Sequence, residues 1–196
     1  PVNDAPVVDA IDAQSTDEDV PFELSLSASD IDEDELTFSA SVDGNGVASV
    51  EGSTLTVVPD NDYFGDIQVT VVASDGQLTD QTSFILTVNN INDAPTVVQI
   101  ADDSIFEDGV YTIDVSGDDN DGDDLSFSAS VDGNGVASVD GSSLTVTPDQ
   151  DFNGDIVVTV TASDTALTGD TSFILTVLPV NDAPVVDAID AQSTDE

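Results

Sequence analysis

A gapless internal repeat of 89 residues constrains this chain more than any other feature. An Asn-Asp-Ala-Pro sequence recurs at 3–6, 92–95 and 181–184, and FSASVDGNGVASV occurs unchanged at 38–50 and 127–139. A period of this length is too long for one turn of a solenoid and matches one small β domain. We therefore predict repeat 1 at 1–89, repeat 2 at 90–178, and the first strand of a third repeat at 179–196.

The opening of the third repeat copies the first repeat and not the second. Residues 179–196 equal residues 1–18 letter for letter, whereas residues 90–107 differ from them at many positions. This predicts a longer parent chain in which two repeat types alternate.

Hydrophobic periodicity within each repeat is that of β-strands. Phe22, Leu24, Leu26 and Ala28 alternate with polar residues, and every other apolar segment has the same period of two. In the first repeat we expect strands at 6–14, 20–28, 35–42, 46–51, 53–58, 66–74 and 80–88. The predicted fold class is all-β, with tandem seven-stranded β-sandwich domains of the immunoglobulin type. The Cys pair and Trp of antibody domains are absent, so the prediction concerns the architecture alone.

The charge of the chain has one sign only. It contains 42 acidic residues, of which seven are Glu, and no Lys, Arg or His. Two carboxylates about 4 Å apart repel by roughly 4 kcal/mol at an effective dielectric constant near 20. Any cluster of them must therefore spread apart or bind an external cation. The same charge disfavours nucleic acid and anionic membrane surfaces as partners, and no apolar run is long enough for membrane insertion.

The side chains needed for most catalytic sites are missing. Without His, Cys, Lys or Arg the chain cannot build a serine triad, a metal–histidine site or a phosphate clamp. Paired carboxylates can hydrolyse glycosides, but here the acids lie on polar loops and recur in every repeat. We therefore expect a protein that is not an enzyme.

Loop parity predicts where the acids gather. Because successive strands of a sandwich run up and down, alternate loops meet at the end where the chain enters a repeat, and the others meet at the end where it leaves. At the entry ends we expect Asn3, Asp4, Asp30, Asp32, Asp34 and Asp75 in repeat 1, and Asp119, Asp121, Asp123 and Asp164 in repeat 2. At the exit ends we expect Glu18, Asp19, Asp62 and Asp66, and then Glu107, Asp108, Asp151 and Asp155. The linkers add Asn90, Asn92, Asp93, Asn181 and Asp182. Carboxylate and amide oxygens converging from two domains suit Ca²⁺, which takes about six to eight oxygen ligands.

These motifs resemble the cadherin repeat, and more closely the cadherin-like tandem repeats of large bacterial surface adhesins of the RTX type. Glu18 and Glu107 match the glutamate after the first strand, and INDAP at 91–95 matches the linker. ASDID at 28–32 and GDDND at 117–121 match the AxDxD loop, and ASD at 73–75 and 162–164 matches the motif before the last strand. The cadherin LDRE motif is absent. The resemblance implies interdomain Ca²⁺ that stiffens an extracellular rod at the bacterial surface. It implies as partners the neighbouring repeats and other copies in a filament or matrix.

Two other functions are compatible with the sequence. One is a module whose faces bind a carbohydrate or a partner protein, and the other is an acidic halophile domain that needs only bulk salt. Comparing Ca²⁺ with Na⁺ at equal ionic strength separates the calcium-stiffened spacer from the halophile domain.

Overall fold

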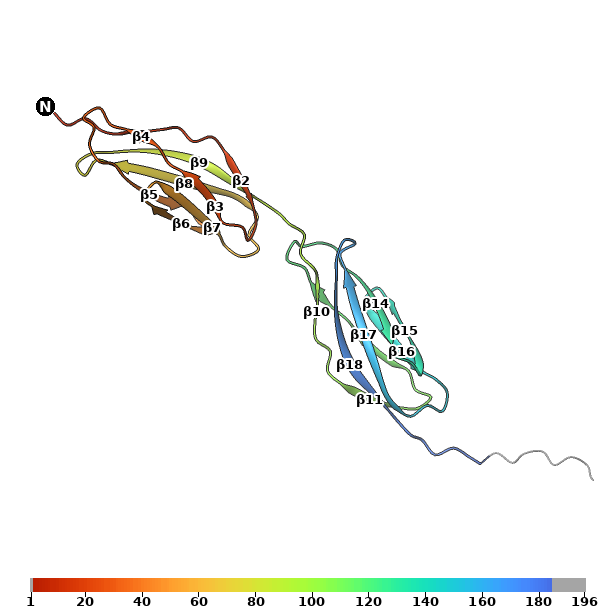
Figure 1. Cartoon of the computed structure of the whole chain (residues 1–196). Coiled ribbons are helices and arrows are strands. Elements are labelled where there is room, and N and C mark those ends of the chain that lie inside the picture. The colour runs from red at the N-terminus through yellow and green to blue at the C-terminus, as the bar shows by residue number, and fades with distance from the viewer. Residues whose placement is uncertain (1, 185–196) are drawn as a thin grey trace, which may run out of the picture. The chain divides into compact units, whose positions relative to one another are not determined.

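The computed structural model describes residues 2–184, so most of the predicted opening strand of a third repeat lies outside the described residues. The chain divides after Asn92 into two compact units, called unit 1 and unit 2, which are described separately (Figure 1). Every element within the described residues is a β-strand, which confirms the all-β prediction. No helix that could cross a membrane occurs in that part of the chain.

Unit 1 is a sandwich of a four-stranded and a three-stranded sheet. Its strands are β1 (Val7–Val8), β2 (Gln14–Asp17), β3 (Phe22–Ser25), β4 (Ala28–Ser29), β5 (Thr37–Val42), β6 (Gly46–Glu51), β7 (Thr54–Pro59), β8 (Gly65–Ser74) and β9 (Thr79–Asn89). One sheet has the order β2-β9-β8-β5 and the other β3-β7-β6, while β1 pairs with β4. All pairs are antiparallel except β2 with β9, which is parallel.

Unit 2 repeats this topology. Its strands are β10 (Thr96–Val97), β11 (Asp103–Phe106), β12 (Tyr111–Asp114), β13 (Gly117–Asp118), β14 (Ser126–Val131), β15 (Gly135–Asp140), β16 (Ser143–Pro148), β17 (Gly154–Ser163) and β18 (Thr168–Leu178). The sheets have the orders β11-β18-β17-β14 and β12-β16-β15, with β10 paired to β13.

Two strands expected from the sequence are broken in the structure. The segment expected as one strand at 6–14 forms β1, which pairs with β4, and the chain then crosses to the other sheet, where β2 pairs with β9. The strand expected at 20–28 divides into β3, which pairs with β7, and β4, which pairs with β1. A hydrophobic period of two cannot reveal a change of partner, since a segment that changes sheets can still bury the same side chains.

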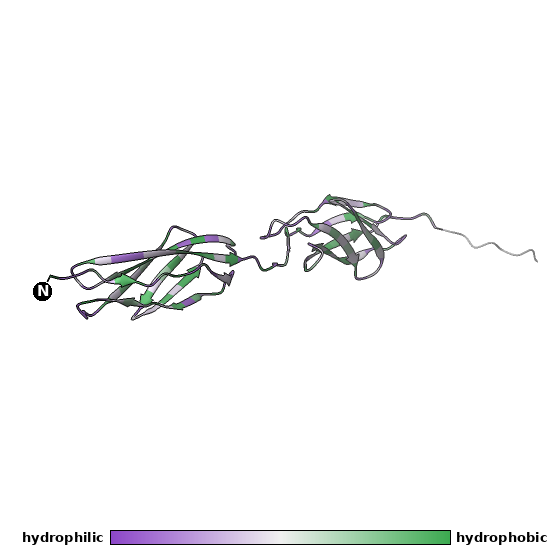
Figure 2. Ribbon diagram, turned by 90° about the horizontal axis from the view of Figure 1, so that it is seen from above, coloured by the Kyte–Doolittle hydropathy of each residue, from purple (hydrophilic) through white to green (hydrophobic). Residues whose placement is uncertain are grey.

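The core of each unit comes from the inward-facing residues of the central strands. Leu55 and Val57 on β7 and Ile67 and Val69 on β8 are fully buried, and unit 2 buries the matching residues of β16 and β17. Apolar and polar residues alternate along the ribbons in Figure 2. Inward-facing residues of the edge strands β5 and β6 are only half-buried.

The loops at the ends of each unit turn at acidic residues in the left-handed conformation. Asp19 and Asp62 in unit 1 have φ of 58° and 54°, and Asp108 and Asp151 in unit 2 have 61° and 60°. Asp tolerates this conformation better than most residues because its short side chain bonds locally. The fold therefore uses some of the predicted ligands as turn residues.

Candidate metal-binding site

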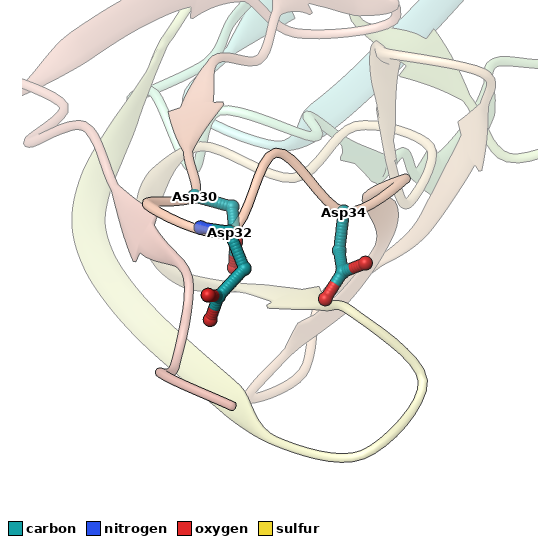
Figure 3. A group of neighbouring side chains, drawn as sticks. All are labelled: Asp30, Asp32 and Asp34. Carbon is teal, nitrogen blue, oxygen red and sulfur yellow. Dashed lines mark hydrogen bonds between the residues drawn. The ribbon is translucent and has the colours of Figure 1, made fainter. Parts of the chain in front are cut away.

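Three carboxylates gather in the loop between β4 and β5 of unit 1. Asp30, Asp32 and Asp34 can each offer an oxygen such that all three atoms lie within 4.8 Å of one another (Figure 3). Asp30 Oδ1 accepts a hydrogen bond from Asp32 N at 2.8 Å, which folds the loop back on itself. The loop therefore brings together charges that repel strongly unless a cation lies among them.

The entering chain and the loop between β8 and β9 complete this end of unit 1. Asp4 N donates to Asp32 Oδ2 at 2.8 Å, and Asn3 Nδ2 donates to Asp75 Oδ2 at 2.7 Å. Asp75 Oδ1 also accepts from the backbone N–H groups of Gln77 and Leu78, at 2.6 Å each. The backbone hydrogen bond from Leu78, followed by those from Gln77 and Asn3, lowers the pKa of Asp75. The entry cluster of unit 1 is Asn3, Asp4, Asp30, Asp32, Asp34 and Asp75.

Unit 2 has a matching entry cluster, made of Asp93, Asp119, Asp121, Asp123 and Asp164. Asp119 Oδ1 accepts from Asp121 N at 3.0 Å and Asp123 N at 3.4 Å, and Asp121 Oδ2 accepts from Asp93 N at 2.6 Å. Asp164 is only 6% exposed, and its Oδ1 accepts from Ala166 N and Leu167 N at 2.6 Å each. Hydrogen bonds thus link Asp93, Asp119, Asp121 and Asp123 at the entry end, as loop parity leads one to expect, and their role as metal ligands stays a prediction.

Each entry cluster contains one buried oxygen without a hydrogen-bond partner. These atoms are Asp30 Oδ2 and Asp119 Oδ2, at equivalent positions of the two repeats. Buried polar atoms are nearly always hydrogen-bonded, and an unsatisfied charged atom costs more than the roughly 1–3 kcal/mol of a neutral one. Because the chain has no cationic side chain, only a group from outside it can neutralise these oxygens.

The exit ends are built around buried glutamates. Glu18 and Glu107 are each 6% exposed. The Oε1 atom of Glu18 accepts a hydrogen bond from Ile91 N, and that of Glu107 accepts one from Val180 N. Their own backbone N–H groups donate to Asn89 O at 3.0 Å and Leu178 O at 2.8 Å. Each glutamate therefore holds the chain where it leaves the last strand.

Two aspartates join each glutamate to form the exit cluster. Asp19 Oδ1 accepts from Asp62 N at 3.2 Å, and Asp108 Oδ1 accepts from Asp151 N at 3.4 Å. Asp151 is exposed, but partial loss of solvation raises the pKa of its carboxyl group, and the negative charges of Asp182, Asp108 and Glu107 raise it further. The linker acid Asp182 thus acts electrostatically on the exit cluster of unit 2, and Asn181 Nδ2 donates to Asp182 O at 3.2 Å.

Asp66 and Asp155 lie in strands rather than in loops. Each is the second residue of a long strand, and its Oδ1 accepts a hydrogen bond at 2.8 Å from the threonine opposite, Thr87 or Thr176. The strand expected at 66–74 already began with Asp66, and in the structure β8 and β17 begin one residue earlier, at Gly65 and Gly154. Asn90 and Asn92 are exposed linker residues.

Sequence analysis missed the backbone partners of the two glutamates. Ile91 and Val180 carry no polar side chain, so residue type gives no sign of their role. The spacing of 73 residues from Glu18 to Ile91 and from Glu107 to Val180 is the one available signal, and it becomes meaningful only when the fold brings both ends together.

The sandwich and its topology define an immunoglobulin-like protein, and comparison with known families is more specific. The family model for the bacterial Ig domain matches residues 3–87 and again residues 92–177. The chain therefore belongs to the bacterial Ig domain family and contains two tandem members of it.

Similar proteins include one enzyme and two cadherins. Over 162 residues the chain is 29% identical to chitinase A of Pseudoalteromonas piscicida, covering 79% of this chain and 19% of the chitinase. Drosophila N-cadherin EC1-4 has a TM-score of 0.58 and 15% identity, over 91% of this chain and 50% of that one. Human protocadherin-24 EC1-2 has a TM-score of 0.57 and 16% identity, over 89% of this chain and 99% of that one. At these identities the cadherins show the fold alone.

Proposed function

We propose that the chain is a spacer of a large bacterial surface protein, in which Ca²⁺ bound where repeats meet stiffens the array. The observation that carries the proposal is the buried oxygen without a partner in each entry cluster, Asp30 Oδ2 and Asp119 Oδ2. A divalent cation supplies the missing partner and offsets the repulsion of the surrounding carboxylates.

The composition of the clusters supports Ca²⁺ over other metals. The candidate ligands are carboxylate and amide oxygens, and the chain has neither the His nor the Cys that zinc and copper prefer. Backbone N–H groups already occupy one oxygen of Asp30, Asp32 and Asp119, which leaves the other oxygen of each to point elsewhere. This division of roles is what a loop that holds a cation requires.

Coupling of the linker to both kinds of cluster supports a mechanical role. Glu18 binds the backbone at Ile91 within unit 1, and Asp121 binds the backbone at Asp93 within unit 2. Only Asn92 separates these two anchored residues. A cation held by acids on both sides of that segment limits the conformations open to it.

The match to chitinase A favours a spacer that also occurs within larger enzymes. The chain spans about a fifth of that relative, and it lacks the His, Cys, Lys and Arg from which a serine triad, a metal–histidine site or a phosphate clamp is built. We therefore propose that the chain itself is not catalytic, and that it acts outside the cell by separating or positioning other parts of its parent protein.

Calcium titration of the whole chain by calorimetry tests the proposal. We expect saturable binding with a dissociation constant of about 10⁻⁴–10⁻³ M, as in other extracellular modules, and no comparable heat from Na⁺ at equal ionic strength. At a hundredfold excess over this constant one site stabilises the ordered state by roughly 2.7 kcal/mol. Scattering should then show a narrower range of distances between the two units in calcium than in chelator.

Matched variants test which residues bind calcium. Asp121→Asn combined with Asp164→Asn should weaken binding and widen the range of distances, and both units should stay folded. Asp43→Asn is the control, since Asp43 lies in a hairpin turn, where it accepts from Gln68 N at 3.0 Å. Equal binding by the double variant and the native chain would refute the assignment of these residues.

A further inference from the structure

Unit 2 carries an exposed apolar pair where unit 1 has a polar one. Phe106 and Leu178 end β11 and β18, lie opposite each other in the parallel ladder, and are 62% and 38% exposed. The same positions in unit 1 are Asp17 and Asn89, and there the Asn89 amide donates to Asp17 Oδ1 at 3.0 Å. The apolar pair lies at the end of unit 2 from which the chain departs, beside Glu107 and its backbone partner Val180.

Unit 1 carries an exposed apolar residue at its opposite end. Ile31 is 79% exposed and lies between Asp30 and Asp32 in the loop that binds the entering chain through Asp4 N. The equivalent residue of unit 2 is Asn120. The entry loop of the first repeat type is therefore apolar at its tip, and that of the second type is polar.

These differences are complementary in an alternating array. The segment that follows unit 2 copies the opening of repeat 1 letter for letter, so a repeat of the first type, with a copy of Ile31, is expected next. Unit 1 has exposed apolar residues of its own in exit-end loops, Val20 and Phe64, but the repeat after it presents Asn120. An apolar contact needs apolar residues on both of the repeats that meet. At these positions only a junction in which a repeat of the second type is followed by one of the first type has them, with Phe106 and Leu178 on one repeat and the copy of Ile31 on the other.

We propose that Phe106 and Leu178 form a docking surface for the repeat that follows in the same chain, and that its copy of Ile31 packs against them. The inference rests on the tandem array of the proposed function and not on calcium. The two kinds of junction therefore differ: one has an apolar contact at these strand ends, and the other has a hydrogen-bonded polar pair there.

Charge favours an occupant within the chain over a second copy. A net charge of −42 opposes the approach of another molecule at low ionic strength. A covalently linked repeat is instead present at an effective concentration of the order of millimolar, so a contact of two or three side chains is enough to shift its position.

The test uses the chain lengthened after Glu196 by residues 19–89, which completes a third repeat of the first type. Because the chain has no Cys, two introduced cysteines take spin labels at unique sites. We place one at Ser128, exposed on β14, and one at the copy of Ser39 in the third repeat, and measure the distance distribution in calcium and in chelator.

The expected result is a narrow distribution that widens when the surface is made polar. Phe106→Asp with Leu178→Asn installs the residues of repeat 1 and should lower the ratio of docked to undocked junctions about tenfold, equal to about 1.4 kcal/mol. Ile→Asn at the copy of Ile31 should lower this ratio by the same factor. Combining it with the changes at Phe106 and Leu178 should lower the ratio no further, because all three side chains belong to one contact. Ile174→Thr, an exposed apolar position on the same face of β18, should change nothing.

Three results would overturn the inference. They are a distribution that the Phe106 and Leu178 changes leave unaltered, effects on the two sides that simply add, and a dipolar signal between singly labelled copies that the same changes abolish. Widening by these changes together with identical distributions in calcium and chelator would keep the docking surface and refute the calcium stiffening.

Discussion

The two repeats differ from each other in sequence much more in their first third than in the remainder. Residues 1–35 differ from 90–124 at 22 of 35 positions, whereas residues 36–89 differ from 125–178 at 14 of 54. The diverged third nevertheless keeps Asn3, Asp4, Glu18, Asp19, Asp30, Asp32 and Asp34 at their equivalent positions in unit 2. Where strand residues have changed freely, the acids of both clusters have not, which indicates a role that the sandwich alone does not require.

The less diverged part holds most of the buried core, and there we expect substitutions to have the largest effect. Leu55→Ala and Leu144→Ala each remove a fully buried side chain at matching positions of β7 and β16. Each should lower the free energy of unfolding of its own unit by about 2–5 kcal/mol. Calorimetry should show one transition shifted and the other in place. A shift of both transitions would mean that the two units unfold together, and Val47→Ser, at an exposed site on β6, is the control.

The entry clusters should respond to substitution with a sign that depends on calcium. Asp30→Asn or Asp119→Asn removes the charge on the buried oxygen that lacks a partner. In chelator this should raise the free energy of unfolding by about 1–3 kcal/mol, because repulsion among the carboxylates falls. In calcium it should lower stability, because a ligand is lost. Denaturant unfolding in both conditions measures the difference, and the same sign in both would exclude a cation at this position.

At one pair of equivalent positions, Asp80 in unit 1 and Gly169 in unit 2, the two units differ in how closely the backbone packs. Asp80 Oδ2 accepts from Val8 N at 2.9 Å in unit 1, while unit 2 has Gly169, where an added Cβ would lie 1.8 Å from Pro95 O. Gly169→Ala should therefore destabilise unit 2 by about 1–3 kcal/mol through steric strain. Asp80→Ala should cost unit 1 about 1 kcal/mol, the value of one hydrogen bond. Thermal unfolding of the two variants compares them, and a neutral Gly169→Ala would contradict this account of the close contact.

We expect the smallest effect from pH, because one carboxyl group at an entry end, Asp75, and one at an exit end, Asp151, have pKa values shifted in opposite directions. The pKa of Asp75 is lowered from 3.8, so its contribution to stability is present above pH 3.8 and is lost as pH falls through its lower folded-state pKa. The pKa of Asp151 is raised from 3.8, so the folded state binds the extra proton and stability falls as pH rises from 3.8 through the raised value. Carbon NMR of the carboxyl groups in chelator should show Asp151 titrating at higher pH than Asp75. The reverse order would contradict the hydrogen bonds assigned to Asp75.

Much of the fold and of the candidate site was predictable from local sequence. The 89-residue period, the alternation at Phe22, Leu24 and Leu26, and the single-sign charge are properties of neighbouring residues, and they predicted the all-β repeats. Loop parity added the grouping of Asp30, Asp32 and Asp75, because the order of antiparallel strands fixes which loops share an end. The metal itself stays a prediction, since it rests on chemistry that the chain only implies.

Tertiary structure decided the rest, because it depends on contacts between distant residues. No local pattern shows that the first strand changes sheets, since β1 and β2 bury side chains with partners far along the chain. Nor does residue type show that Glu18 accepts a hydrogen bond from Ile91 N, that Asp66 accepts one from the Thr87 hydroxyl, or that one oxygen of Asp30 is buried without a partner. The sequence by itself determined which groups this protein has and the period at which they recur. The packing of two sheets decided which of them are buried, which of them meet, and which charges are left without a partner.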